Sequence, residues 1–494
     1  MKARRSIHFR RLIYAFLIAI FAIGAIYYIR QANFEPIRPL SDGDTMIRFV
    51  SLGVLAAIAS FSLLTACKNA PASIAATSSV AAVEPLPSHA KPFMAQVVGV
   101  QWLNPLQRRD YPTEWQLLWT LGLAKPNKAD DMVEAKPKKY SVLQAVGPIA
   151  AGNDGRETFK GFHHKYLKEL TLPLFGPYFK YSTYFYNAHS TEDKSTWREL
   201  AGIHVEYALP EGRLDPEEAK NYLRERIAGL FNIGNLHFPT TWSRSTPPDV
   251  HVHMGGPNAG FTSLSAALDY LQAHPDETVW AMNWDAPNFP PKDEQINENM
   301  VLLVLAGPSY KTGRNALAWI GHPASRSAAD FEAKKGLPSR PVQAWQATVM
   351  TAAANAGKEP IDIGYTIHDA NNTHQDSPDR LGNLAQTLTM EVPELDFGKQ
   401  SFNTPALLGE MGAGTALTNV ALGIAYANHL GKNVLVAGTS DLSRPTAVLV
   451  VPPEKVRPID HEVPWFRARS EAAAYLMWWG LRHDAEAFMQ GYSE

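Results

Sequence analysis

Apolar side chains recur along most of this chain in short continuous runs, separated by segments in which they follow helical spacing. The clearest run is residues 300–306 (MVLLVLA), where every residue is apolar; such a run predicts a strand buried on both faces. Further strands are predicted at 95–100, 250–253, 279–283, 363–367, 434–437 and 447–451. Helices are predicted at 113–121, from Asp215 onward, and at 262–273, 342–356 and 414–429. Strands that alternate with helices indicate an α/β fold whose sheet is covered on both faces.

The N-terminal region carries two longer apolar runs without a charge. Residues 12–29 follow five basic residues within the first eleven positions, and their length is near the lower limit for crossing a bilayer. Residues 49–66 follow Arg48 and end at Cys67. We expect residues 1–67 to anchor the protein in a membrane, with the basic N-terminus in the cytoplasm. The Ala-, Ser- and Pro-rich residues 68–92 are predicted to be a flexible linker.

This region has two interpretations. Both runs can span the inner membrane as a hairpin, which leaves the body of the protein in the cytoplasm. Alternatively, the stretch Leu64-Thr65-Ala66-Cys67 resembles a bacterial lipobox. Translation would then start at Met46 rather than Met1, and the product would be a periplasmic lipoprotein anchored at Cys67.

Composition narrows the classes of protein that remain. The 494 residues include 46 basic and 48 acidic side chains, a net charge of −2, which argues against a nucleic-acid-binding protein. Only 19% of residues are charged, too few for a disordered chain. The single cysteine, Cys67, excludes a disulfide framework, a cysteine-ligated zinc site and an iron–sulfur cluster.

Four stretches of the body, taken together, resemble the thiolase/β-ketoacyl-synthase family. They are residues 96–118, 258–285, 363–376 and 408–451. The resemblance implies a duplicated, layered α/β body with helices flanking mixed sheets. Its two halves are expected at 93–250 and 251–453, before an aromatic helical tail at 454–494. It also implies a homodimer, which the charged insertion at 124–139 would obstruct.

The catalytic groups of that family do not carry over to this chain. The position of the nucleophilic cysteine falls at about Gly260, which has no side chain to attack a thioester. The histidine loop keeps His368, with Asp376 eight residues later, and Glu410 stands where the second histidine would be. We therefore expect a vestigial pocket, no enzyme activity and no cofactor. The alternative is an enzyme of this fold that uses His368, Glu410 and Asp376 as acid–base groups.

The overall layout also resembles the adaptor family of bacterial type VI secretion, which escorts a phospholipase effector to the secretion spike protein. This resemblance implies protein partners and a cytoplasmic body, because effectors are loaded there, and so favours the membrane hairpin. A further alternative is a periplasmic lipoprotein with a binding or immunity role. Aromatic residues and arginine are enriched in protein-binding hot spots, and the tail contains several that are candidates for partner contact or for packing on the body's own sheet. They are Trp465, Phe466, Trp478, Trp479 and Arg482.

Two histidines, His251 and His253, alternate on a predicted strand and so point to one face. Together with a carboxylate from elsewhere they would suit a metal ion. The alternative is a strand end with partly exposed histidines, and on this interpretation the protein has no metal site. We expect no metal.

Overall fold

The computed structural model describes residues 92–103, 112–125, 186–188, 204–231, 248–286, 296–311, 315–370 and 376–459, with a few positions between 134 and 171, at 461 and at 480–481. The chain divides into two units, Met1–Ser88 and His89–Glu494, and every described residue belongs to the second. In that described part, no helix is both long and apolar enough to cross a membrane. The two predicted membrane segments, Cys67 and nearly all of the linker lie outside the described residues.

Twelve of the described strands form one mixed sheet, and two more form a separate antiparallel pair. The strands of the large sheet are β1 (Met94–Leu103), β3 (Tyr186–Asn187), β4 (His204–Pro210), β5 (Asp249–Gly255), β6 (Thr278–Asp285), β7 (Asn299–Ala306), β8 (Trp319–Gly321), β9 (Ala324–Ser325), β10 (Ile363–His368), β11 (Ser401–Asn403), β12 (Asn433–Gly438) and β13 (Thr446–Val451). The separate pair is β2 (Gly147–Ala150) and β14 (Gly480–Leu481). The α-helices are α3 (Thr113–Thr120), α8 (Pro216–Phe231), α9 (Ala259–Ala273), α10 (Arg340–Asn355), α11 (Ser377–Glu391), α12 (Thr404–Leu408) and α13 (Thr415–Leu430).

The order of strands repeats itself around the centre of the sheet. The order is β11-β10-β12-β13-β8-β1-β7-β6-β4-β5, so that β5-β4-β6-β7-β1 is matched by β11-β10-β12-β13-β8. The directions match too: β4 and β10 each have two parallel neighbours, while β6–β7 and β12–β13 are antiparallel. The body therefore consists of two topologically equivalent halves that meet where β1 pairs antiparallel with β8.

The change from one half to the other lies between Ala306, the last residue of β7, and Trp319, the first of β8. The expected boundary at 250/251 falls inside β5, which is still part of the first half. The reason is that β5, α9, β6 and β7 complete the first repeat. A boundary before them would separate β5 from β4, its parallel neighbour.

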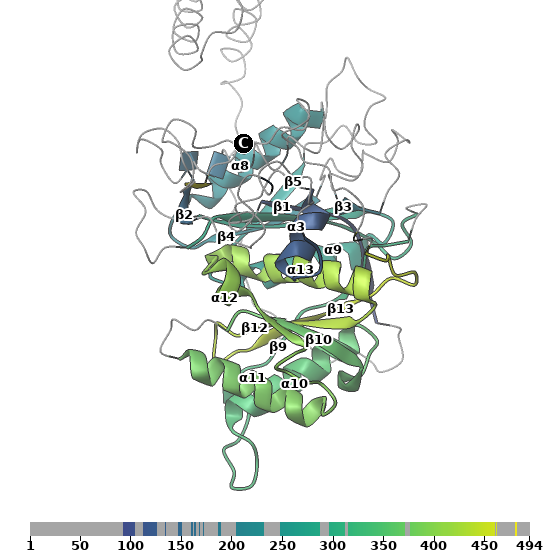
Figure 1. The fold of residues 1–494 in the computed structure, drawn as a ribbon. Coiled ribbons are helices and arrows are strands. Elements are labelled where there is room, and N and C mark those ends of the chain that lie inside the picture. Colours follow the sequence, from purple (N-terminus) through teal and green to yellow (C-terminus); the bar gives the residue numbers. More distant parts are fainter. Residues whose placement is uncertain are drawn as a thin grey trace, which may run out of the picture. The chain divides into compact units, whose positions relative to one another are not determined.

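Helices lie on both faces of the strands and also between the two halves. In Figure 1, α13 lies between the strands of the first half and those of the second, while α10 and α11 cover the outer face of the second half. Nearly every residue of α13 is buried, which agrees with its sequence of small and apolar residues. A Cβ at Gly423 would lie 3.1 Å from a methyl group of Val436, so glycine permits the close approach of α13 to β12. The buried helix predicted at 414–429 is confirmed.

Candidate functional site

The N-terminal ends of the two buried helices α9 and α13 meet at the position where the family resemblance placed a nucleophile. Gly260 is the second residue of α9 and Ala416 the second residue of α13. A Cβ at Gly260 would lie 3.0 Å from the Cβ of Ala416 and 3.1 Å from the backbone nitrogen of Leu417. Any side chain at position 260 would therefore displace α13. The predicted position lies in a packed helix–helix contact.

The loop that carries Glu410 precedes α13 and is held by the segment before β7. The backbone N–H of Asn297 donates to the carbonyl of Glu410 at 2.5 Å, and the Asn297 side chain donates to the carbonyl of Leu408, also at 2.5 Å. Gly409 and Gly412 have φ angles of 70° and 51°, in the left-handed region that favours glycine. These contacts fix the course of the loop.

The group that reaches this loop from the first half is Asp285, at the end of β6. Its Oδ2 accepts a hydrogen bond from the backbone N–H of Ala413 at 3.0 Å, and its Oδ1 accepts one from the N–H of Ala286 at 2.8 Å. Arg213 Nη1 donates to Oδ1 at 2.7 Å, and Nη2 donates to the carbonyl of Ala286 at 2.7 Å. A buried ion pair thus occupies the start of the short turn that leads into α13.

Burial decides the protonation behaviour of this pair. Asp285 is 1% exposed, and desolvation raises the pKa of its carboxyl to about 6, although Arg213 and the two backbone N–H groups act in the opposite direction. Desolvation also lowers the pKa of Arg213, against the attraction of Asp285. We missed both residues in the sequence, where Arg213 follows β4 and Asp285 ends β6. Because β4 and β6 are parallel neighbours, their carboxyl ends meet at one edge, and this adjacency is the signal that could have found the pair.

His368 and Asp376 are each engaged in separate structural contacts. His368 ends β10, is 2% exposed and stacks on Phe397 with 5.6 Å between ring centroids. Burial lowers the pKa of its imidazole to about 4, so the ring is neutral at neutral pH. Asp376 precedes α11 and accepts from Arg380 at 2.7 Å. The next residue after His368, Asp369, is buried and accepts a hydrogen bond from the backbone N–H of Thr439 at 2.5 Å.

The two histidines of the predicted strand both lie on β5, but they contact different carboxylates. His251 Nε2 lies 2.9 Å from Asp249 Oδ2, whereas His253 Nε2 lies 2.6 Å from Glu206 Oε2 on β4. They therefore do not converge on one ion as a pair. The five tail residues proposed for partner contact, from Trp465 to Arg482, lie outside the described residues.

Exposed apolar side chains gather on the second half of the body. Among the described residues, the large hydrophobic side chains with the greatest exposure are all at or beyond position 337. Four of them lie on or beside the outer helices α10 and α11, and we call these four the outer helix face. They are Leu337, Met350, Ile361 and Met390. The two helices are joined by a 2.9 Å hydrogen bond from Gln346 to Glu391.

The solved structures to which this chain is similar include two of low identity that show the range of the match. An oxazolomycin ketosynthase domain from Streptomyces albus is 12% identical, with a TM-score of 0.43; the match covers 76% of this chain and 100% of that one. The 3-oxoacyl-[acyl-carrier-protein] synthase III from Aquifex aeolicus is also 12% identical, with a TM-score of 0.38, over 72% of this chain and 99% of that one. No curated protein matches the chain.

One family model matches, and it covers the second half of the body. The matched residues, 317–452, begin just before β8 and end just after β13. The resemblance to type VI adaptors expected from the sequence is confirmed over this segment, which is similar to the family described as Type VI lipase adapter protein Tla3, C-terminal.

Proposed function

We propose that this protein is a non-catalytic adaptor that binds a phospholipase effector of type VI secretion and directs it to the secretion spike protein. The observation that carries this proposal is the match of residues 317–452 to the C-terminal region of type VI lipase adapters. The match coincides with one complete structural half, from β8 to β13, and so concerns a whole unit of the fold.

The surroundings of the vestigial residues support a non-catalytic role. Gly260 lies against Ala416 and Leu417 with no space for a nucleophile. The turn into α13, whose backbone N–H groups would otherwise stabilise a reacting anion, already holds the carboxylate of Asp285. The alternative enzyme, with His368, Glu410 and Asp376 as acid–base groups, draws no support from His368 and Asp376, because His368 stacks on Phe397 and Asp376 binds Arg380.

The outer helix face is our candidate for effector contact. Met350 and Leu337 are each 53% exposed, and Met390 is 48% exposed. Methionine is a flexible, polarisable side chain that is frequent on protein-binding surfaces. These side chains belong to the matched half, which places them in the region that the adapter family shares.

We further propose that residues 1–67 anchor the protein in the inner membrane and that the body faces the cytoplasm, where a secreted effector would be loaded. Fusion of a green-fluorescent protein and of alkaline phosphatase to the C-terminus tests this topology. Fluorescence without phosphatase activity is the expected result. Phosphatase activity without fluorescence would favour the alternative lipoprotein anchored at Cys67.

The main experiment is co-purification of the tagged full chain with a type VI phospholipase effector, followed by light scattering to obtain the mass of the complex. We expect a stable complex with the wild type, and the same measurement reports whether the chain is a homodimer. The double variant Met350→Asp/Met390→Asp should bind at least tenfold more weakly. The matched control Asn221→Asp/Arg224→Asp places two carboxylates on the exposed side of α8 in the first half and should bind like the wild type.

The results separate two parts of the proposal. A wild-type chain that forms no complex with any such lipase overturns the adaptor function. A complex that both double variants retain equally overturns only the outer helix face as the site of contact. A lipase that binds and becomes part of a ternary complex with the spike protein supports the whole proposal.

A further inference from the structure

A cluster of histidine and carboxylate side chains lies on one face of the neighbouring strands β4 and β5. The two strands are parallel, with His204 opposite Asp249 and Glu206 opposite His251. Side chains alternate along a strand, so residues two apart point the same way. The register therefore brings His204 and Glu206 of β4 beside Asp249 and His251 of β5. The strand β5 ends the order of the large sheet, which leaves this cluster near an edge.

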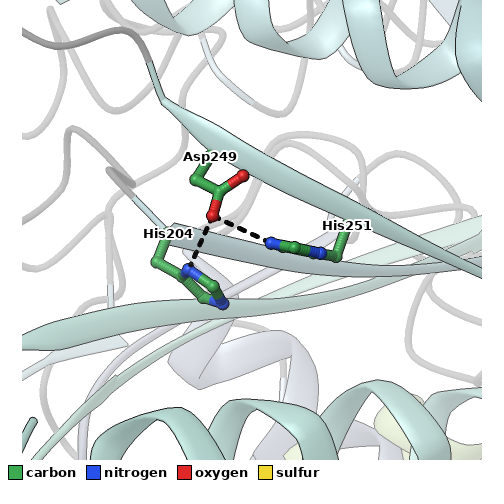
Figure 2. Close-up of side chains that lie close together, drawn as sticks. All are labelled: His204, Asp249 and His251. Carbon is green, nitrogen blue, oxygen red and sulfur yellow. Dashed lines mark hydrogen bonds and ion pairs between the residues drawn. The ribbon is translucent and has the colours of Figure 1, made fainter. Parts of the chain in front are cut away.

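Three of these side chains point their ligand atoms at one another, as Figure 2 shows. Asp249 Oδ2 lies 2.9 Å from His251 Nε2 and 3.6 Å from His204 Nδ1, and the three atoms all lie within 4.8 Å of one another. Two ligand atoms bound to one tetrahedral zinc ion lie about 3.3 Å apart, since each bond is about 2.0–2.1 Å. The spacing of the cluster brackets that value, so small side-chain movements would close it around an ion.

The histidine on β4 is held as metal-binding histidines usually are. Its second ring nitrogen, Nε2, lies 2.7 Å from Oε1 of Glu206, a residue that is only 5% exposed. A carboxylate in this position accepts a hydrogen bond from Nε2–H, which keeps the proton on Nε2 and leaves the lone pair of Nδ1 facing Asp249. The ring of Tyr270 stacks on His204 with 3.7 Å between centroids and fixes its plane. Tyr270 is in turn held by its hydroxyl, which donates to Glu277 at 2.5 Å.

The cluster is closed on one side and open on the other. The side chain of His204 is 9% exposed, whereas those of His251 and Asp249 are 47% and 63% exposed. A site with three protein ligands and an open side leaves a fourth position for water or for a group from another molecule. Two imidazoles and one carboxylate suit zinc and its neighbours in the first transition row, and not magnesium or calcium, which prefer oxygen ligands.

We propose that His204, Asp249 and His251 form a binding site for a divalent transition-metal ion, with zinc as its natural occupant. The ion would join β5 to β4 through side chains, in addition to their backbone hydrogen bonds. His253, which the sequence offered beside His251 as one of two interpretations, is not a ligand of this site, because it is held by Glu206. The site is independent of the proposed adaptor function, and neither depends on the other.

The test is a titration of the chelator-treated full chain with zinc chloride, followed by calorimetry and by thermal unfolding. We expect one zinc ion per chain at this site and a higher melting temperature with zinc. The variants His251→Ala and Asp249→Asn change exposed residues, so they should fold normally but bind zinc at least 100-fold more weakly and lose the thermal shift. The matched control His461→Ala removes an exposed histidine elsewhere and should retain both.

Two further measurements distinguish a built site from surface binding. Cobalt(II) substituted for zinc should give the intense visible absorption of a tetrahedral complex, and His251→Ala should abolish it. Glu206→Gln removes no ligand but weakens the support of His204, together with the contact to His253. It should weaken zinc binding about 10–100-fold while one ion still binds. Zinc binding that is the same in the wild type, His251→Ala and Asp249→Asn would overturn the proposal, as would the absence of any zinc-dependent shift in melting temperature.

Discussion

The two halves of the body share one topology but differ where a strand of each half meets a helix of the other. In the first half β6 ends in Asp285, whose carboxylate enters the turn before α13. In the second half the equivalent strand, β12, ends in Gly438, where a Cβ would overlap the side-chain oxygen of Asn258 and lie 2.7 Å from the ring of Phe261 on α9. One junction therefore contains an ion pair with a buried carboxylate, and the other is close packing of uncharged groups around a glycine. Duplication of a fold preserves the path of the chain and leaves the chemistry of each junction free to change.

The halves also differ at their outer parts. The edge strand β5 of the first half carries Asp249 and His251, whereas the equivalent strand β11 carries Ser401, Phe402 and Asn403. Of the residues that the structure describes, those with strongly exposed large apolar side chains belong to the second half or to the segment that follows it. On the two proposals above, partner contact would use one copy of the repeat and ion binding the other.

The most severe test of the junction difference is Gly412→Ala. Gly412 has a φ of 51°, and a methyl group there would overlap the carboxylate of Asp285. Strain of the backbone and overpacking together should lower the free energy of unfolding by about 4 kcal/mol. Chemical denaturation monitored by circular dichroism measures this. Gly229→Ala is the control, because Gly229 lies on α8 with open space around it, and the exchange should stabilise the protein slightly. Equal stabilities for the two variants would refute the tight junction.

The next largest effect is expected for Arg213→Met, which leaves Asp285 buried without its cation. At pH 8 the variant should be about 3 kcal/mol less stable than the wild type. The pKa of Asp285 is already raised to about 6, and loss of Arg213 raises it further. The carboxyl therefore takes up a proton at pH 5, and the cost of the substitution should shrink there. Denaturation curves at both pH values check this, with Arg224→Met as an exposed control. A cost that does not depend on pH would contradict a buried carboxylate.

The strands β4 and β10 occupy equivalent places in the two halves but end differently. β10 ends in His368, which can take up a proton, and β4 ends in Pro210, which cannot. The pKa of His368 is lowered to about 4, below its ordinary 6.5, so the unfolded chain binds the proton more readily. The stability that this group contributes is present above pH 6.5 and is lost as the pH falls toward 4. The free energy of unfolding should therefore fall between pH 7.5 and pH 5, and His368→Asn should make that fall about 2 kcal/mol smaller. The control His461→Asn should leave the pH dependence unaltered.

The smallest effect is expected where the two halves are most alike, at the second residues of α9 and α13. Gly260→Ala would bring a methyl group to 3.0 Å from the Cβ of Ala416. The two helices would have to separate by a few tenths of an ångström, which should cost about 1 kcal/mol. Thermal unfolding measures the loss. A variant as stable as the wild type would mean that the helix ends are loosely packed and leave space for a side chain.

The elements of the fold were largely predictable from the sequence, since their cause is local. The apolar run at 300–306 is β7, and the small-residue segment at 414–429 is α13. Both are buried on all sides, so their composition alone identified them. The expected boundary at 250/251 falls inside β5, because the end of a repeat depends on which strands pair with each other. That information is absent from any single segment.

The sites were much less predictable, because their groups come from distant parts of the chain. Arg213 and Asp285 are 72 positions apart and meet only because β4 and β6 are neighbours. His204 and Asp249 are brought opposite each other by strand register. The alternation of His251 and His253 along β5 could not reveal that His253 contacts Glu206 of β4. Gly260 lies at the start of a helix, α9, but the tight contact around it comes from Ala416 and Leu417 of α13, which no local pattern could reveal.

The nearly complete burial of α13 has a practical consequence for anyone who dissects this protein. The helix lies inside the segment 317–452, yet one of its faces packs on β12 and β13 and another on β1, β7 and α9 of the first half. If expressed alone, the segment would present a long apolar helix surface to water and would aggregate or fold incompletely. The stretch that the family model matches, residues 317–452, is therefore not expected to fold by itself. Truncations intended to map partners should begin near His89, where the compact body begins.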